Sequence, residues 1–178
     1  KTVRCIAREV VSSANEIPLH ITVAVALIKQ QRYEFMVEKA TELGAHTIQP
    51  LLTQRVVRKG FRRDRLEKKA IAAMEQSERA YLPDIPDPVE LKKYIANIDN
   101  NHLFVAAQSA ESKSLIDLLS KREYDNIIIL IGPEGGWSDS ELSLFGEQQI
   151  QNFHLGRRRL RTETAALSAL SLVSQFFE

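Results

Sequence analysis

Cysteine is almost missing from this chain, because Cys5 is the only one in 178 residues. A single cysteine excludes a disulfide within the chain and a cysteine-rich zinc site, and it fits a protein of the reducing cytoplasm. Glycine and proline number only seven and six, which excludes a collagen-like or low-complexity segment. Apolar runs such as residues 127–131 are far too short to span a membrane. These absences leave a globular protein.

Charged residues are plentiful, but they are unevenly placed. The chain has 24 basic and 23 acidic residues, for a net charge of +1. Residues 55–79 hold nine basic and four acidic side chains, and residues 154–163 hold four arginines and one glutamate, so the rest of the chain is acidic. Two basic segments on an acidic body indicate a polyanionic partner such as RNA or DNA. A basic run is also typical of a solvated helix face.

Hydrophobic periodicity predicts one domain in which strands and helices alternate. Apolar strands such as NIIILI (126–131) are typical of strands buried on both faces, so the expected fold is α/β, a parallel sheet with helices on both faces. We expect strands at 2–11, 20–27, 46–52, 103–107, 126–131 and 151–155, and helices at 33–43, 61–80, 90–96, 115–120, 138–146 and 162–177. The last helix is apolar almost all round, which predicts burial within the subunit or in a subunit interface.

The sharpest local motif is IGPEGGW, residues 131–137. A buried strand ends here, glycines follow, and a helix begins with the capping box formed by Ser138 and Glu141. Ligands of open α/β sheets bind beyond the carboxyl ends of the strands, and glycines let the backbone approach them closely. The motif is neither a P-loop nor G-x-G-x-x-G, and Pro133 removes one N–H donor. An ordinary strand-to-helix turn is the competing interpretation.

A second motif, LGRRRLRTETAAL at residues 155–167, again runs from a strand end through a glycine into a helix. Thr162 is the expected N-cap, and Glu163 in the first turn suits the helix dipole. Neither role explains four arginines just before an apolar helix. Arginines held there would suit a nucleotide base or a phosphate.

The remaining reactive side chains form no recognisable pattern. His20, His46, His102 and His154 lack the spacing of metal ligands, and we expect no metal site. The chain contains no G-x-S-x-G sequence, which argues against a serine hydrolase of that type.

Four strings taken together resemble one family: YEFMVEKATELGAHTIQPLLTQR (33–55), EQSERAYLPDI (75–85), IGPEGGW (131–137) and LGRRRLRTETAAL (155–167). They are similar to the bacterial uridine-N3 methyltransferases of small-subunit (16S) ribosomal RNA, which belong to the SPOUT, or trefoil-knot, class. The resemblance spans about residues 17–178, with the motifs in family order. That family carries an N-terminal PUA-like RNA-binding domain, and residues 1–16 look like its last strand.

The resemblance implies a C-terminal deep trefoil knot, S-adenosylmethionine as cofactor, and a homodimer that acts on ribosomal RNA in the cytoplasm. The implied cofactor contacts are Ala106, Ala107, Ile131, Gly132, Pro133, Glu134, Gly135, Gly136, Leu155, Gly156, Leu160, Thr162 and Ala165. The implied RNA contacts are Arg55, Arg58, Arg62, Arg65, Lys69, Arg79 and Arg158. The chain departs from the family pattern at Glu78, where glycine is usual, and at Arg157 and Arg159.

For the reaction itself, the resemblance implies that N3 of uridine loses a proton and attacks the methyl group. We expect Arg161 to stabilise the anionic base, and Glu134 or Glu163 to take the proton, although either glutamate also suits the role of orienting Arg161 or capping a helix. Two alternatives stay open: another knotted RNA methyltransferase, such as a ribose 2′-O enzyme, and a non-enzymatic RNA-binding or ribosome-assembly module.

Overall fold

A computed structural model describes residues 4, 16–56, 60–98, 102–107, 112–121 and 123–178. Its strands are β1 His20–Ala26, β2 Thr47–Leu52, β3 Val89–Glu90, β4 Leu103–Ala106, β5 Lys113–Ser114, β6 Asn126–Ile131 and β7 Gln151–His154. Its helices are α1 Gln30–Glu42, α2 Arg63–Gln76, α3 Leu91–Ile95, α4 Leu115–Leu119, α5 Asp139–Glu147 and α6 Thr162–Phe177.

The strands form one parallel sheet in the order β3-β2-β1-β6-β4-β7-β5. The central strands β1 and β6 pair from His20 with Asn126 to Val25 with Ile131. The β1 strand therefore lies between β2, the next strand in the sequence, and β6, which comes about a hundred residues later. All carboxyl ends of the strands point to one edge of the sheet, which is where ligands bind in such folds.

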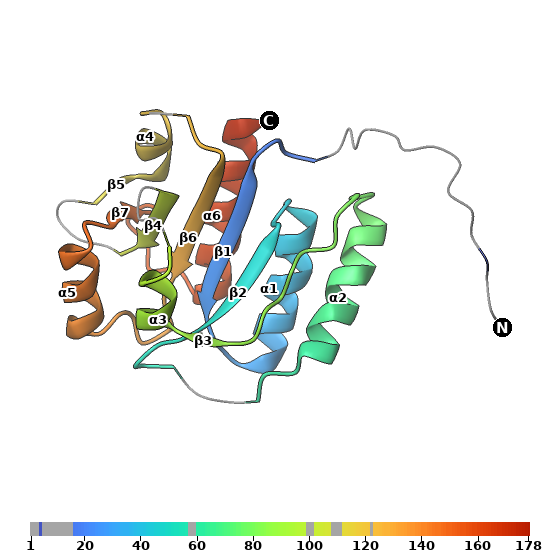
Figure 1. Cartoon of the computed structure of the whole chain (residues 1–178), viewed down its shortest axis with the longest axis horizontal. Coiled ribbons are helices and arrows are strands. Elements are labelled where there is room, and N and C mark those ends of the chain that lie inside the picture. Colours follow the sequence, from blue (N-terminus) through green and yellow to red (C-terminus); the bar gives the residue numbers. More distant parts are fainter. Residues whose placement is uncertain (1–3, 5–15, 57–59, 99–101, 108–111, 122) are drawn as a thin grey trace.

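Helices cover both faces of the sheet, as the sequence predicted (Figure 1). One face carries α1, α2, α4 and α6, whose buried side chains join alternate residues of the central strands, such as Val23 and Ile129, in the larger core. The other face carries α3 and α5, which pack on Ala24 and Leu130 in a smaller core. Because β1 and β6 are buried on both faces, their runs of apolar residues have no polar alternation.

The α6 helix lies inside the subunit against α1, α4, β1 and β6. Its buried residues include Ala166, Leu170 and Val173, so packing against the sheet accounts for much of its apolar character. Near its end, Phe176 is 40% exposed. The structure thus confirms the first of the two expected locations for this helix.

Most predicted elements agree with the structure, with shifted ends. The α2 helix stops at Gln76 rather than at residue 80, because Glu78 adopts a positive φ of 55° that a helix cannot continue through. A glycine is favoured at such a position, which fits the glycine that the resemblance leads us to expect there. The two-residue strands β3 and β5 were not predicted. The strand expected at 2–11 lies outside the described residues, apart from Arg4.

A buried ion pair stabilises the amino edge of the sheet. The Arg79 guanidinium donates to both carboxylate oxygens of Glu16, at 2.8–3.3 Å, and to the carbonyl oxygens of Thr41 and Ala45. Its side chain is only 3% exposed. The expectation that Arg79 contacts RNA is therefore wrong, because its donors are used inside the fold.

No helix in the described part of the chain is long and apolar enough to cross a membrane. Among the same residues, no group of three or more histidine, cysteine, aspartate or glutamate side chains is placed to hold a metal ion.

Candidate functional site

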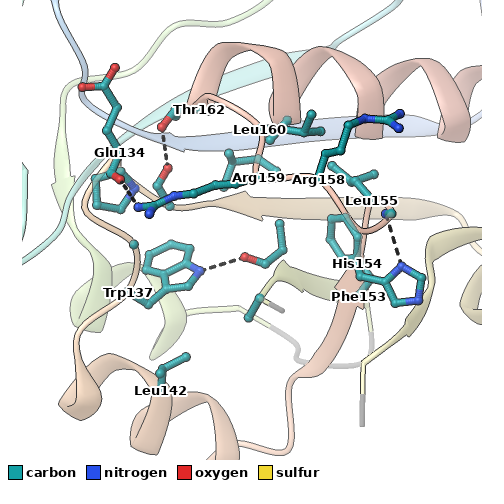
Figure 2. Close-up of a pocket in the computed structure, with 18 residues that line it drawn as sticks. Glu134, Trp137, Leu142, Phe153, His154, Leu155, Arg158, Arg159, Leu160 and Thr162 are labelled. Carbon is teal, nitrogen blue, oxygen red and sulfur yellow. Dashed lines mark hydrogen bonds between the residues drawn. The ribbon is translucent and has the colours of Figure 1, made fainter. Parts of the chain in front are cut away.

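A cleft of about 460 Å³ opens beyond the carboxyl ends of β4, β6 and β7 (Figure 2). It is lined by Ala106, Ala107, Ile131, Gly132, Pro133, Glu134, Gly136, Trp137, Leu142, Phe153, His154, Leu155, Gly156, Arg158, Arg159, Leu160, Thr162 and Ala165. Twelve of the thirteen predicted cofactor contacts are among them. The exception is Gly135, which faces the Arg55 side chain.

The first loop of the cleft, residues 132–137, follows the end of β6. A Cβ added at Gly132 would lie 2.9 Å from the Trp137 ring, so only glycine fits there without displacing the indole. The indole nitrogen in turn donates to the Ala106 carbonyl at 2.9 Å, which ties this loop to the end of β4. Gly136 has a φ of +72°, and its N–H closes the turn on the Pro133 carbonyl at 2.8 Å. The predicted capping box of Ser138 and Glu141 then starts α5.

The second loop, residues 155–161, runs from β7 into α6. Gly156 turns it with a φ of +95°. The Thr162 hydroxyl donates to the Gly132 carbonyl at 2.9 Å and so joins the two loops. The expectation that Thr162 is the N-cap is wrong: the cap position is Arg161, and Thr162 is the first helical residue.

Two arginines brace the first loop, one from beyond β2 and one from the second loop. Arg55, just beyond β2, donates through Nη1 to the carbonyl oxygens of Gly135 at 3.1 Å and Trp137 at 2.9 Å. Arg159 reaches across the cleft and donates through Nη2 to the backbone carbonyl of Glu134 at 2.9 Å (Figure 2). The backbone of this loop is therefore held in place before any ligand arrives.

Arg32, in the first turn of α1, links the two glutamates that the sequence singled out. Its Nη1 donates to Oε1 of Glu134, and its Nε lies 3.8 Å from Oε1 of Glu163. The Glu134 side chain is 47% exposed, whereas that of Glu163 is only 10% exposed. Sequence reasoning missed Arg32, because no recognisable motif surrounds it and its partner Glu134 lies 102 positions away.

Several residues predicted to contact RNA, and the catalytic candidate Arg161, lie at the surface or in the cleft. Arg161 is exposed at the start of α6, and Arg158 lines the cleft. Arg62 pairs with Asp64 at 3.1 Å, Arg65 lies 3.8 Å from Glu34, and Lys69 lies 3.2 Å from Glu38. Each of these three basic side chains is about half exposed. Arg58 lies outside the described residues.

Five residues that line the cleft were not predicted: Trp137, Leu142, Phe153, His154 and Arg159. Two of them, Trp137 and Arg159, belong to the motifs already quoted. Phe153 and His154 end β7, and the rule that ligands lie beyond strand ends would have indicated them. Leu142 is an exposed leucine on α5, and no sequence pattern distinguishes it.

The lining suits a small molecule with one apolar, flat part and one polar part. Leucine, phenylalanine and alanine side chains form the walls, and backbone groups of two glycine-containing loops, two arginines and a glutamate supply the polar edges. A volume of this size lies within the range of ordinary ligand sites. A nucleoside-like ligand fits this description.

The fold and cleft define an RNA methyltransferase domain: the family model described as "RNA methyltransferase domain" matches residues 15–174. This chain belongs to that family. It is similar to ribosomal RNA small subunit methyltransferase E of Synechocystis, with 34% identity over 96% of this chain and 58% of the relative. It is also similar to the protein of that name from Bacillus subtilis, with 32% identity over 97% of this chain and 72% of the relative.

A solved structure shares the fold at a TM-score of 0.80 and 29% identity, over 91% of this chain and 68% of that one. It is a ribosomal RNA small subunit methyltransferase E from Neisseria gonorrhoeae bound to S-adenosyl methionine. The chain thus spans only part of the length of these relatives.

Proposed function

We propose that this chain is the catalytic domain of an enzyme that methylates N3 of a uridine in 16S ribosomal RNA and uses S-adenosylmethionine. The observation that carries the proposal is the cleft at the carboxyl edge of the sheet. It is formed by the loops at 132–137 and 155–161, which belong to the two motifs that resemble the family. The relatives named above support the cofactor and the RNA class. The choice of N3 rests on the sequence resemblance.

The residues of the cleft fit S-adenosylmethionine. Leu142, Phe153 and Leu160 offer apolar contact to a purine ring, and the backbone of residues 132–136 and 155–156 offers donors and acceptors to its edge and to a ribose. The Glu134 carboxylate at the rim suits a ligand that carries positive charge. When bound, this cofactor supplies a methyl group on a sulfonium, whose sulfur leaves as a neutral thioether without help from a metal.

The protein then has to orient the uracil and stabilise its anion as N3 loses a proton. Arg161, which is exposed at the end of the second loop, would offer positive charge to the uracil carbonyls or to a phosphate. Glu134 and Glu163 remain the two candidates for the proton acceptor. Arg62, Arg65 and Lys69 would contact RNA phosphates, so RNA binding should weaken steeply as salt rises.

Several finer features belong to the same proposal. The loops at 132–137 and 155–161 would form a trefoil knot, and two chains would form a homodimer. Residues 1–16 would be the end of a PUA-like RNA-binding domain, and the enzyme would act in the cytoplasm. Sequence specificity for structured RNA would depend in part on that further domain.

The test is methyl transfer to small ribosomal subunits that lack the modification, followed by nucleoside analysis. The proposal expects N3-methyluridine as the product. A ribose 2′-O-methyl product would instead block alkaline cleavage at one position and would overturn the N3 assignment. The Arg161→Ala variant should bind the cofactor normally and react about 100-fold more slowly. A wild-type rate for that variant would remove Arg161 from the reaction.

A further inference from the structure

Glu163 is a buried carboxylate that the fold satisfies only in part. The residue is 8% exposed, and its Oε2 has no hydrogen-bond partner among the described residues. Its Oε1 has one cation, Arg32 Nε, at 3.8 Å, which is longer than a hydrogen bond. A buried carboxylate oxygen without a donor is costly, so one kept in this way requires an explanation.

The position of Glu163 associates it with the cleft. It follows Thr162, whose side chain lines the cleft and bonds to Gly132. Through Arg32 it is also linked to Glu134, which lines the cleft as well. Glu163 and Arg32 are not themselves lining residues, but each adjoins one: Glu163 follows Thr162 along the chain, and Arg32 pairs with Glu134. A donor on a bound base would satisfy the unpaired oxygen.

Resting on the proposed function, we propose that Glu163 Oε2 accepts the N3 proton of uracil and thereby selects uracil over cytosine, with Arg32 as its positioning residue. The N3 atom of uracil is a donor, whereas N3 of cytosine is an acceptor next to an amino group. A carboxylate oxygen pairs with the first and repels the lone pair of the second. A site built to bond a donor rejects the analogue that lacks it, because the buried group is then unpaired.

The reaction step balances without any further reactant. The N3–H bond breaks, and its proton moves to Glu163 Oε2. The electron pair that remains on N3 forms the new bond to the methyl carbon, while the pair of the carbon–sulfur bond stays on sulfur. The proton passes from Glu163 to water after the product leaves.

Glu134 is the weaker candidate for the same role. Its side chain is half exposed, and its Oε1 already accepts from Arg32, while its backbone carbonyl accepts from Arg159. It therefore serves as an anchor that orients Arg32, which in turn lies 3.8 Å from Oε1 of Glu163, while Oε2 has no partner among the described residues. This assignment separates the two glutamates that the sequence alone treated as equivalent.

The experiment compares Glu163→Gln, Glu134→Gln, Arg32→Lys and Arg32→Met with the wild type. The matched controls are Glu90→Gln and Lys93→Met, which remove the two charges of an exposed pair between the end of β3 and α3; neither residue lines the cleft. The readouts are kcat and KM on small subunits, thermal unfolding, and binding of RNA with uridine or cytidine at the target position in the presence of S-adenosylhomocysteine.

We expect Glu163→Gln to fold, to lose kcat by about 100-fold or more, and to lose the preference of the wild type for uridine over cytidine. Arg32→Met should lower kcat with little change in KM for the cofactor, and Arg32→Lys should recover part of the loss. Glu134→Gln should have a smaller effect than Glu163→Gln.

The inference is overturned if Glu163→Gln keeps both the rate and the uridine preference, or if Glu134→Gln has the larger effect. If Glu163→Gln does not fold, the binding preference of Arg32→Met decides: an unchanged preference together with an unchanged kcat overturns the proposal. A folded wild type that forms no N3-methyluridine overturns the proposed function and the inference together, whereas an active wild type with unaffected variants overturns only the inference.

Discussion

Two buried glutamates at opposite edges of the sheet differ in how well the fold satisfies them. At the amino edge, Glu16 accepts hydrogen bonds from the Arg79 guanidinium and from the backbone N–H groups of Ala80 and Tyr81. Burial raises the pKa of Glu16, but the hydrogen bonds from Arg79 and Ala80 outweigh it, so that the pKa is lowered overall. At the carboxyl edge, Glu163 has one cation at 3.8 Å and one bare oxygen.

The difference indicates that the two edges have different tasks. A buried carboxylate with every oxygen paired contributes to holding the native structure, and removing a partner leaves an uncompensated charge. A buried carboxylate with an unpaired oxygen is a cost to stability that a bound ligand can offset. The amino edge is thus built for stability, and the carboxyl edge is built for a ligand.

The largest expected effect is on stability at the amino edge. Glu16→Gln leaves the buried Arg79 charge without its counter-charge, so we expect a loss of about 3–5 kcal/mol in the free energy of unfolding. Glu163→Gln removes a poorly satisfied charge, so it should leave that free energy unchanged or raise it. Urea unfolding of both variants measures the contrast. Equal losses for the two variants would contradict the comparison.

The next effect is on the cleft. Gly132→Ala places a Cβ against the Trp137 ring, so the loop must shift and S-adenosylmethionine should bind at least tenfold more weakly, for a strain of about 1–3 kcal/mol. Gly146→Ala is the control, because this α5 glycine has open space around it among the described residues. It should leave the affinity unchanged and stabilise the helix by about 0.5–1 kcal/mol. Titration calorimetry distinguishes the two variants, and an unchanged affinity for Gly132→Ala would show that the loop is not a rigid part of the site.

A glycine at position 78 should stabilise the amino edge. Glu78 has a positive φ just after Ser77, the C-cap of α2, so Glu78→Gly should raise the free energy of unfolding by about 1 kcal/mol. The control is Glu75→Gly, an exposed position inside the same helix, which should lower it by about 1 kcal/mol. Chemical denaturation measures both. A loss for both variants would mean that the backbone at Glu78 is not strained.

The smallest effect is a pH dependence at the amino edge. Burial lowers the pKa of His46, and the nearby His20 and Arg79 lower it further. The Glu16 charge raises this pKa, but the pKa is lowered overall. The neutral Nδ1 of His46 accepts from the Ile21 N–H. As the pH falls below about 6.5, the unfolded chain binds a proton that the folded chain does not, so stability should fall. A flat stability profile between pH 7 and 5.5, or an identical profile for His46→Gln, would contradict this account.

Sequence reasoning succeeded where the signal is local. The apolar run at β6 and the bounds of α6 agree with the structure to the residue, and the capping box at Ser138 is present. These features depend on neighbours within one or two turns, which a sequence displays directly. The two glycine-containing loops were found for the same reason.

It failed where tertiary contacts decide. Arg79 looked like any other arginine of the basic segment, but the fold buries it against Glu16, 63 positions away. Thr162 has a residue type that favours an N-cap, yet its hydroxyl bonds to Gly132. Arg32 had no distinguishing pattern, because its role depends on two glutamates brought from the far end of the chain.

The most direct test of the central claim is a calorimetric titration of the folded protein with S-adenosylmethionine, alongside its mass in solution. If the cleft at the carboxyl edge is the cofactor site, a dimer should bind with micromolar-range affinity, about −8 kcal/mol, and Gly132→Ala should weaken that binding. A folded wild-type dimer that takes up no S-adenosylmethionine would contradict the account.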